Sequence, residues 1–158
     1  EGAPKNWQLK ADESESVLGT KMHALLAQLQ TANEVEKVVQ QAIQKGSFAA
    51  EEQAQLSQSL QALVLHPQLA PFYQAGLDVL NERSLLVPGQ KQRIPDRVVL
   101  ENNTAHILDY KTGKALPQHK KQVDDYATVL QNMGYQIGHR YLVYLGQTLH
   151  LVANWKRS

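Results

Sequence analysis

The sequence predicts an α/β domain in which a helical segment precedes a β-sheet flanked by helices. Apolar residues recur at helical spacing through the first half of the 158-residue chain. The second half instead has short runs rich in Val, Ile, Leu and Tyr, separated by turn residues. One helical stripe lies between the third and fourth of these runs, so the expected order is helices, three strands, a helix and two strands.

The first helix is expected in SVLGTKMHALLAQLQ, where Met22, Leu25 and Leu26 belong to an apolar stripe. Thr31 and Glu34 have the spacing of a capping box, which predicts the start of a second helix.

Gly46 is expected to end the second helix, and Ser47 is a candidate cap for a third. The third helix should close before Pro67, because the residue that precedes a proline is disfavoured in helical conformation. A short fourth helix is expected in PQLAPFYQAG.

Five strands and one helix are expected in the second half. Pro88 and Gly89, Asn102 and Asn103, and Gly146 provide turn signals. The helix in PQHKKQVDDYATVLQNMG should stop at its final glycine. The expected strands lie within 77–87, 92–101, 104–111, 135–145 and 148–154, and the buried stripe of the helix is Val123, Tyr126, Ala127, Leu130 and Met133.

Composition excludes several kinds of site. The chain has no cysteine, so it forms no disulfide, thiolate zinc site or cysteine-ligated iron–sulfur cluster, and it has no cysteine nucleophile. No apolar run reaches the length of a membrane span, and no signal pattern precedes the first helix. Residues 1–82 contain five Lys and Arg and ten Asp and Glu, whereas residues 83–158 contain eleven Lys and Arg and five Asp and Glu. The second half is therefore basic, and a basic surface can bind phosphate groups.

One domain is expected over 1–158, with a mostly helical part at 1–75 and a sheet core at 76–158. The chain begins with glutamate, which suggests a fragment of a longer polypeptide.

Two aspartates and a lysine are predicted to share one face of the sheet. If Asn102 and Asn103 form a two-residue turn, Asp96 faces Asp109 with β-carbons about 4.5 to 5.5 Å apart. Lys111 joins that face because strand side chains alternate with a period of two. Two carboxylates this close repel each other, and a hard divalent cation such as Mg²⁺ resolves the repulsion.

A structural interpretation of the same residues stays open. An Asp-x-Lys sequence on a strand is more often a solvated face or a salt bridge. Asp96 can pair with Arg93, Arg97 or Lys111, and a bulge at Pro95 would shift the register.

These residues carry the pattern of a known family. Pro95-Asp96 followed by Asp109-Tyr110-Lys111 resembles the PD-(D/E)xK nuclease signature. More narrowly, RIPDRVV, ILDYKTG and HKKQVDDYATVL resemble the RecB-type nuclease domain of bacterial helicase–nucleases, and LGTKMHALL is similar to its Gly-Thr-x-x-His motif. The resemblance runs roughly from Gly19 to Leu145. It implies a restriction-endonuclease-like core, with a central mixed β-sheet flanked by helices and preceded by an N-terminal helical segment.

The resemblance also implies roles for individual residues. His23, Asp96, Asp109 and the main-chain carbonyl of Tyr110 would hold Mg²⁺, for which Mn²⁺ would substitute. Lys111 would be the catalytic lysine.

Gln122 and Tyr126 match the family's Gln-x-x-x-Tyr motif and would orient that lysine or touch DNA. Glu82 is a possible third acid. The iron–sulfur clasp of some relatives is not expected, because it needs cysteines. Basic residues expected to contact the DNA backbone are Arg93, Arg97, Lys114, Lys120 and Lys121.

The function implied is that of a Mg²⁺-dependent deoxyribonuclease, expected to act as an exonuclease on single-stranded DNA or unwound ends. The resemblance places such a domain beside a helicase in the same polypeptide, with a possible second subunit, in double-strand break repair in the bacterial cytoplasm at the nucleoid. The phosphate-binding pattern GxxxxGK[ST] does not occur, so ATP use would reside elsewhere. Two other interpretations stay open: an inactive nuclease-like module for DNA binding or subunit docking, and a standalone single-strand exonuclease.

Overall fold

The computed structural model describes residues 15–80, 95–146 and 149–157. It separates into two compact units. We call Glu1–Gly76 with Leu145–Leu149 the helical unit, and Leu77–Tyr144 with His150–Ser158 the sheet unit. No helix in the described residues is long and apolar enough to span a bilayer.

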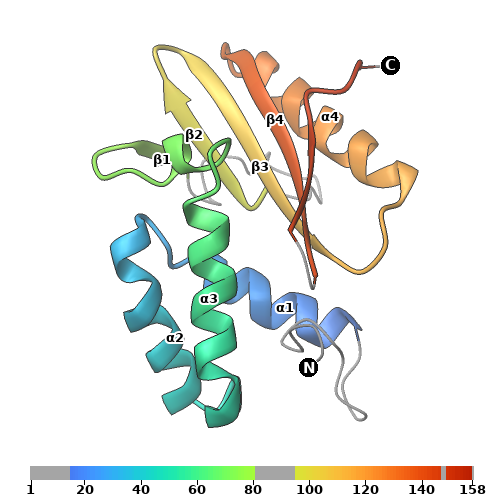
Figure 1. Ribbon diagram of the computed structural model, residues 1–158. Coiled ribbons are helices and arrows are strands. Elements are labelled where there is room, and N and C mark those ends of the chain that lie inside the picture. The colour runs from blue at the N-terminus through green and yellow to red at the C-terminus, as the bar shows by residue number, and fades with distance from the viewer. Residues whose placement is uncertain (1–14, 81–94, 147–148, 158) are drawn as a thin grey trace. The chain divides into compact units, whose positions relative to one another are not determined.

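The helical unit contains the three long helices that the apolar spacing predicts, coloured blue to green in Figure 1. They are α1 (Glu15–Leu26), α2 (Val35–Gln44) and α3 (Gln53–Val64). The apolar stripes of these helices are buried, and Met22, Leu56 and Leu60 are each fully inaccessible. Hydrophobic burial along these stripes therefore holds the unit together.

The starts of α2 and α3 are fixed by glutamates. Glu34 Oε1 accepts a hydrogen bond of 2.7 Å from the Thr31 N–H, which confirms this part of the predicted capping box. The prediction that Ser47 caps the third helix is wrong, because the helical turn begins later. At the start of this turn, Glu52 Oε1 accepts a hydrogen bond of 2.7 Å from the Ala49 N–H. A 3₁₀ turn at Ala50–Glu52 then leads into α3.

The predicted fourth helix is only one 3₁₀ turn, Ala70–Phe72. Pro71 lies inside that turn and supplies no N–H donor.

The sheet unit has five strands in the order β1-β2-β3-β4-β5. Neighbours are antiparallel in the pairs β1/β2, β2/β3 and β4/β5. The Gln136 N–H donates to the Asn103 carbonyl at 3.0 Å, so β3 and β4 begin at the same edge and run in the same direction, which makes the sheet mixed (Figure 1). The elements are β1 (Asp78–Leu80), β2 (Arg97–Glu101), β3 (Thr104–Thr112), α4 (Pro117–Asn132), β4 (Gln136–Leu145) and β5 (His150–Ala153).

The β2/β3 hairpin has the predicted register. Asn102 and Asn103 have φ angles of 51° and 64°, as a type I′ turn requires of both central residues. Arg97 faces Leu108, and each following pair keeps the same relation up to Glu101 and Thr104. The register prediction is therefore confirmed, and Pro95 does not disturb it.

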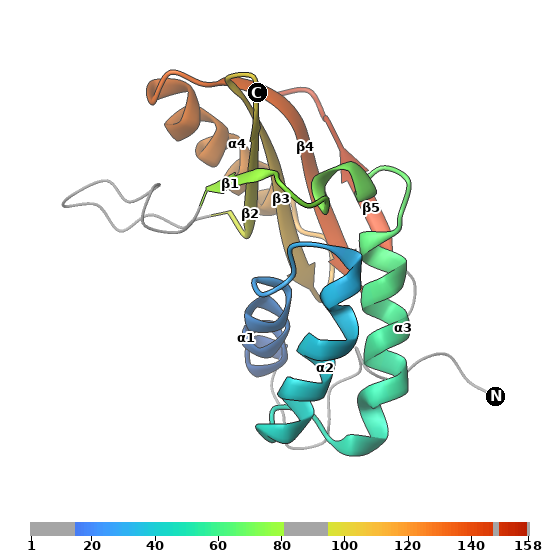
Figure 2. The same ribbon diagram turned by 90° about the vertical axis from the view of Figure 1, so that its left-hand side faces the viewer.

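Helix α4 covers one face of the sheet (Figures 1 and 2). Its residues Val123 and Leu130 form a buried cluster with Ile107 of β3 and Leu142 of β4. Met133 was expected in this stripe, but it follows the last helical residue and its side chain is 45% exposed. Gly134, with φ of 102°, then ends the segment as predicted.

Candidate active site

Two aspartates lie side by side at the end of the β2/β3 hairpin. Asp109 is on β3, and Asp96 lies one residue before β2 rather than on the strand. The Asp96 N–H donates to Asp109 Oδ1 at 3.3 Å, and Asp96 Oδ2 accepts the Tyr110 N–H at 2.8 Å. Each carboxylate thus accepts a hydrogen bond from a backbone N–H of the neighbouring segment, and these two bonds keep Asp96 beside Asp109, as the register predicts.

The environment of Asp109 disfavours its charge. Its side chain is buried, and burial raises the pKa of the carboxyl to about 7. The neighbouring Asp96 raises this pKa further, whereas Lys111 opposes the shift. Negative charge at this position is therefore under-compensated, and it would be stabilised by a cation.

Lys111 is held between the strand and the helix. Its Nζ lies 3.2 Å from Asp109 Oδ2 and donates a hydrogen bond of 2.8 Å to Gln122 Oε1 on α4. The strand period places Lys111 on the face of Asp109, and that face is the one α4 covers. The ammonium is thus kept beside the carboxylate pair by two separate elements.

Sequence reasoning missed a third group near this site. His119 Nδ1 lies 2.8 Å from Tyr144 Oη, and the Leu116 N–H donates to the same nitrogen at 3.3 Å. Burial raises the pKa of the Tyr144 phenol, and the charge of Asp109 contributes to the shift. Tyr144 therefore lies close enough to Asp109 for the two side chains to interact electrostatically.

A weak signal for this pair exists in the sequence. His119 precedes Gln122 by three residues and so shares its helical face. Tyr144 falls near the end of β4, the strand that neighbours β3. Pairing the two requires knowing that β3 and β4 are parallel neighbours, which the sequence alone does not give.

The donor set suits a hard divalent cation. Asp96 and Asp109 offer carboxylate oxygens, and Asp109 Oδ2 is buried with the Lys111 ammonium 3.2 Å away. Among the residues that the structure describes, no group of three or more His, Cys, Asp or Glu side chains surrounds a common point. The two acids can therefore hold a cation only with further ligands. His23, the expected third ligand, is half-buried on α1 of the helical unit.

The other predicted site residues lie as follows. Tyr126 lies on α4 one turn after Gln122, and its side chain is buried in the core cluster between this helix and the sheet. Arg97 is buried, with 5% of its surface exposed. Lys121 pairs with Asp125 at 3.1 Å on the exposed side of α4. Lys114 and Lys120 are exposed, while Arg93 and Glu82 lie outside the described residues.

A family model matches most of the chain. The family described as the PD-(D/E)XK nuclease superfamily matches residues 1–146, a stretch that contains the aspartate pair, Lys111 and the whole of α4. No curated protein matches the chain.

Proposed function

Because the chain belongs to the PD-(D/E)XK nuclease superfamily, we propose that it hydrolyses the phosphodiester bonds of DNA with the help of a divalent cation. The mixed five-stranded sheet with flanking helices is the restriction-endonuclease-like fold expected of this superfamily. Mg²⁺ is the proposed cofactor, with Mn²⁺ as a substitute.

The observation that carries this proposal is the arrangement of Asp96, Asp109 and Lys111. Two carboxylates, each accepting a hydrogen bond from a backbone N–H of the neighbouring segment, lie beside an ammonium 3.2 Å from one of them. A purely structural ion pair needs one acid and one base. The second acid, the half-buried Asp96, adds negative charge beside the buried Asp109, and a bound cation would offset that charge, which favours a catalytic use.

Each residue has a proposed role. Asp96 and Asp109 hold the cation, with His23 and the Tyr110 carbonyl as further ligands. When bound, the cation lowers the pKa of a water molecule and polarises the scissile phosphate. Lys111 orients the attacking water or offsets the charge that develops at phosphorus. Gln122 keeps the Lys111 ammonium in place through their hydrogen bond of 2.8 Å.

We further propose that the domain is the nuclease module of a RecB-type helicase–nuclease. The motifs RIPDRVV and LGTKMHALL support this narrower assignment, as does the contact of Lys111 with a residue of the Gln-x-x-x-Tyr motif. In that setting it would act as an exonuclease on unwound ends during break repair in the bacterial cytoplasm. The helicase would lie in the same polypeptide, and a second subunit would assist.

A cleavage assay on end-labelled single- and double-stranded DNA tests the activity, with EDTA, Mg²⁺ or Mn²⁺ present. Metal-dependent cutting is expected in the wild type and should be lost in Lys111→Ala. Lys156→Ala is the matched control, because this lysine is exposed in the sheet unit and is not among the residues expected to contact DNA. Cutting by Lys111→Ala at the wild-type rate would remove Lys111 from the mechanism, and a wild type without cutting in either metal would contradict the activity.

A further inference from the structure

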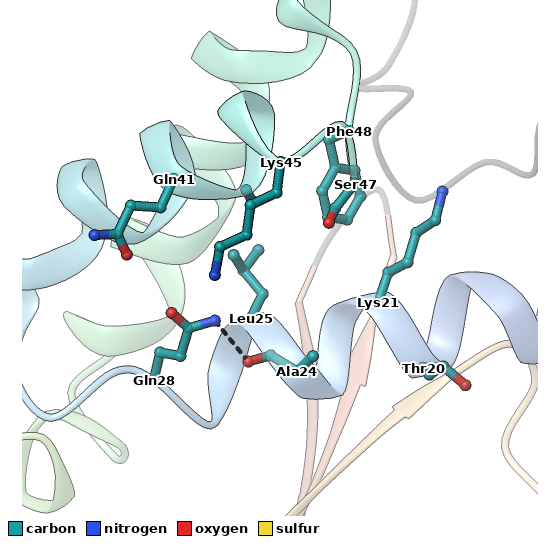
Figure 3. Close-up of a pocket in the computed structure, with 10 residues that line it drawn as sticks. Thr20, Lys21, Ala24, Leu25, Gln28, Gln41, Lys45, Ser47 and Phe48 are labelled. Carbon is teal, nitrogen blue, oxygen red and sulfur yellow. Dashed lines mark hydrogen bonds between the residues drawn. The ribbon is translucent and has the colours of Figure 1, made fainter.

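A pocket of about 310 Å³ lies in the helical unit, and all the residues that line it belong to this unit. It is formed between α1 and the end of α2 with the segment that follows (Figure 3). Leu25 and Phe48 are buried beneath it, whereas Lys21, Lys45 and Gln28 lie at its rim. This volume is at the lower limit for small-molecule sites, so it suits a group the size of one nucleotide.

Positive charge is concentrated at this pocket. The described part of the helical unit has three lysines, and two of them, Lys21 and Lys45, line the pocket. Among the described side chains, none of the glutamates of α2 or α3 and their preceding turns lines it, although the first half of the chain is acidic. An anion approaching this unit is therefore attracted to the pocket and repelled around it.

The two lysines approach the pocket from different elements. Lys21 Nζ lies 5.6 Å from the centroid of the Phe48 ring, a cation–π distance that restricts its position. Lys45 follows the last residue of α2, and Figure 3 shows its side chain running across the pocket toward Gln28. Gln28 is itself fixed by a hydrogen bond of 3.1 Å from its Nε2 to the Ala24 carbonyl. Figure 3 shows the Lys21 ammonium on the other side of Phe48 from Lys45, so the two cations flank the apolar floor of the pocket.

We infer that this pocket binds one nucleotide of a single-stranded nucleic acid, with its sugar against the apolar floor and its two flanking phosphates at Lys45 and Lys21 on either side. The inference rests on the proposed nuclease function, for which it supplies a further site that holds the substrate strand. On α1, Lys21 and His23 are two residues apart, which turns them about 200° from each other around the helix. The same helix would therefore carry a metal ligand on one side and a strand-binding lysine on the other.

Binding of a fluorescent single-stranded oligonucleotide, measured by anisotropy in EDTA, tests this inference without any cutting. Lys21→Glu and Lys45→Glu should each weaken binding about tenfold and lower the salt-dependence slope by about 0.7 for a lost phosphate contact. Lys37→Glu makes the same charge change on α2 outside the pocket, and it should weaken binding less than about threefold. Ala24→Leu fills the pocket without a charge change and should also weaken binding.

The outcomes separate this inference from the proposed function. Equal losses in Lys45→Glu and Lys37→Glu, or no oligonucleotide binding by the wild type in low salt, would overturn the inference even if the protein cuts DNA. Loss of binding in the pocket variants alone would support it even if no cutting is found. Equally strong competition by a poly-glutamate peptide of matched charge would assign the pocket to an acidic protein partner and overturn the nucleic-acid assignment.

Discussion

The Lys111 ammonium donates a hydrogen bond of 2.8 Å to Gln122 Oε1 and lies 3.2 Å from Asp109 Oδ2. This single side chain therefore connects β3, α4 and the acid pair. Its position depends on the helix as well as on the strand that carries it.

Gln122→Met should lower the rate of cutting about 10- to 100-fold, as expected when a residue that orients a site group is removed. Methionine keeps the length of the side chain and removes the acceptor for the ammonium. Single-turnover cleavage measures the rate, and calorimetry with Mn²⁺ should show metal affinity nearly unchanged. Gln118→Met, exposed in the first turn of α4, is the control. Equal rates in the two variants would show that Lys111 needs no partner on the helix.

Asp109→Asn should stabilise the metal-free protein at high pH. The pKa of Asp109 is about 7 in the folded state against 3.8 ordinarily, so its ionised form destabilises the fold. This penalty appears as the pH rises from about 4 to 7 and is complete above 7, where the gain should be about 2 to 4 kcal/mol. The gain should shrink as the pH falls toward 4.

Urea unfolding in EDTA at several pH values measures this difference. Asp125→Asn is the control, because Asp125 is exposed and pairs with Lys121 on the surface. A gain that does not change with pH would mean that Asp109 is not responsible for the effect.

Tyr144→Phe should lower the free energy of unfolding by about 1 kcal/mol, the usual contribution of one buried hydrogen bond. The hydroxyl is the partner of His119 Nδ1 at 2.8 Å, and both residues are buried. Tyr135→Phe removes a hydroxyl from a half-buried tyrosine of the same unit and should change stability less. Equal effects in denaturant melts would contradict a structural role for the His119–Tyr144 contact.

Asp124 should contribute far more to stability than its neighbour Asp125. Asp124 accepts hydrogen bonds from Arg140 at 2.8 Å and from the Trp155 indole at 3.1 Å, and the Arg140 side chain is 9% exposed. Asp124→Ala leaves this buried guanidinium without its carboxylate, at a cost of about 3 to 5 kcal/mol. Asp125→Ala removes only an exposed pair with Lys121 and should cost under about 1 kcal/mol. Similar losses in thermal unfolding would show that the Arg140 pair is not a structural anchor.

The hairpin at the site was predictable because its determinants are local. Asn102 and Asn103 fix the turn, the turn fixes the register, and the register brings Asp96 to Asp109. The position of Lys111 follows from strand alternation alone.

Two features were not predicted from the sequence. One is a contact between residues that are distant along the chain, and the other is the choice between two residues that could each cap the same helix. His119 and Tyr144 are 25 residues apart and meet only because α4 packs over two parallel strands. Ser47 has a suitable side chain for a cap, but the Glu52 carboxylate satisfies the backbone two residues later at Ala49.

Gly138→Ala should destabilise the sheet unit, because β4 passes very close to a histidine of β3. A Cβ at this position would overlap His106 Cε1 and lie 2.8 Å from Thr104 Cγ2. His106 has little freedom to move, since its Nδ1 accepts the His139 N–H at 3.0 Å. We expect a loss of about 1 to 3 kcal/mol in the free energy of unfolding, as for other overpacked sites.

A double-mutant cycle with His106→Ala identifies the cause of this loss. If the imidazole is the obstacle, Gly138→Ala should cost less in the His106→Ala background, with a coupling energy of about 0.5 to 3 kcal/mol. Part of the cost should remain, because the Thr104 methyl group still lies in the way. Strict additivity in urea unfolding would show that the strand moves to accept the methyl group. The close approach of β4 to His106 would then not explain the glycine.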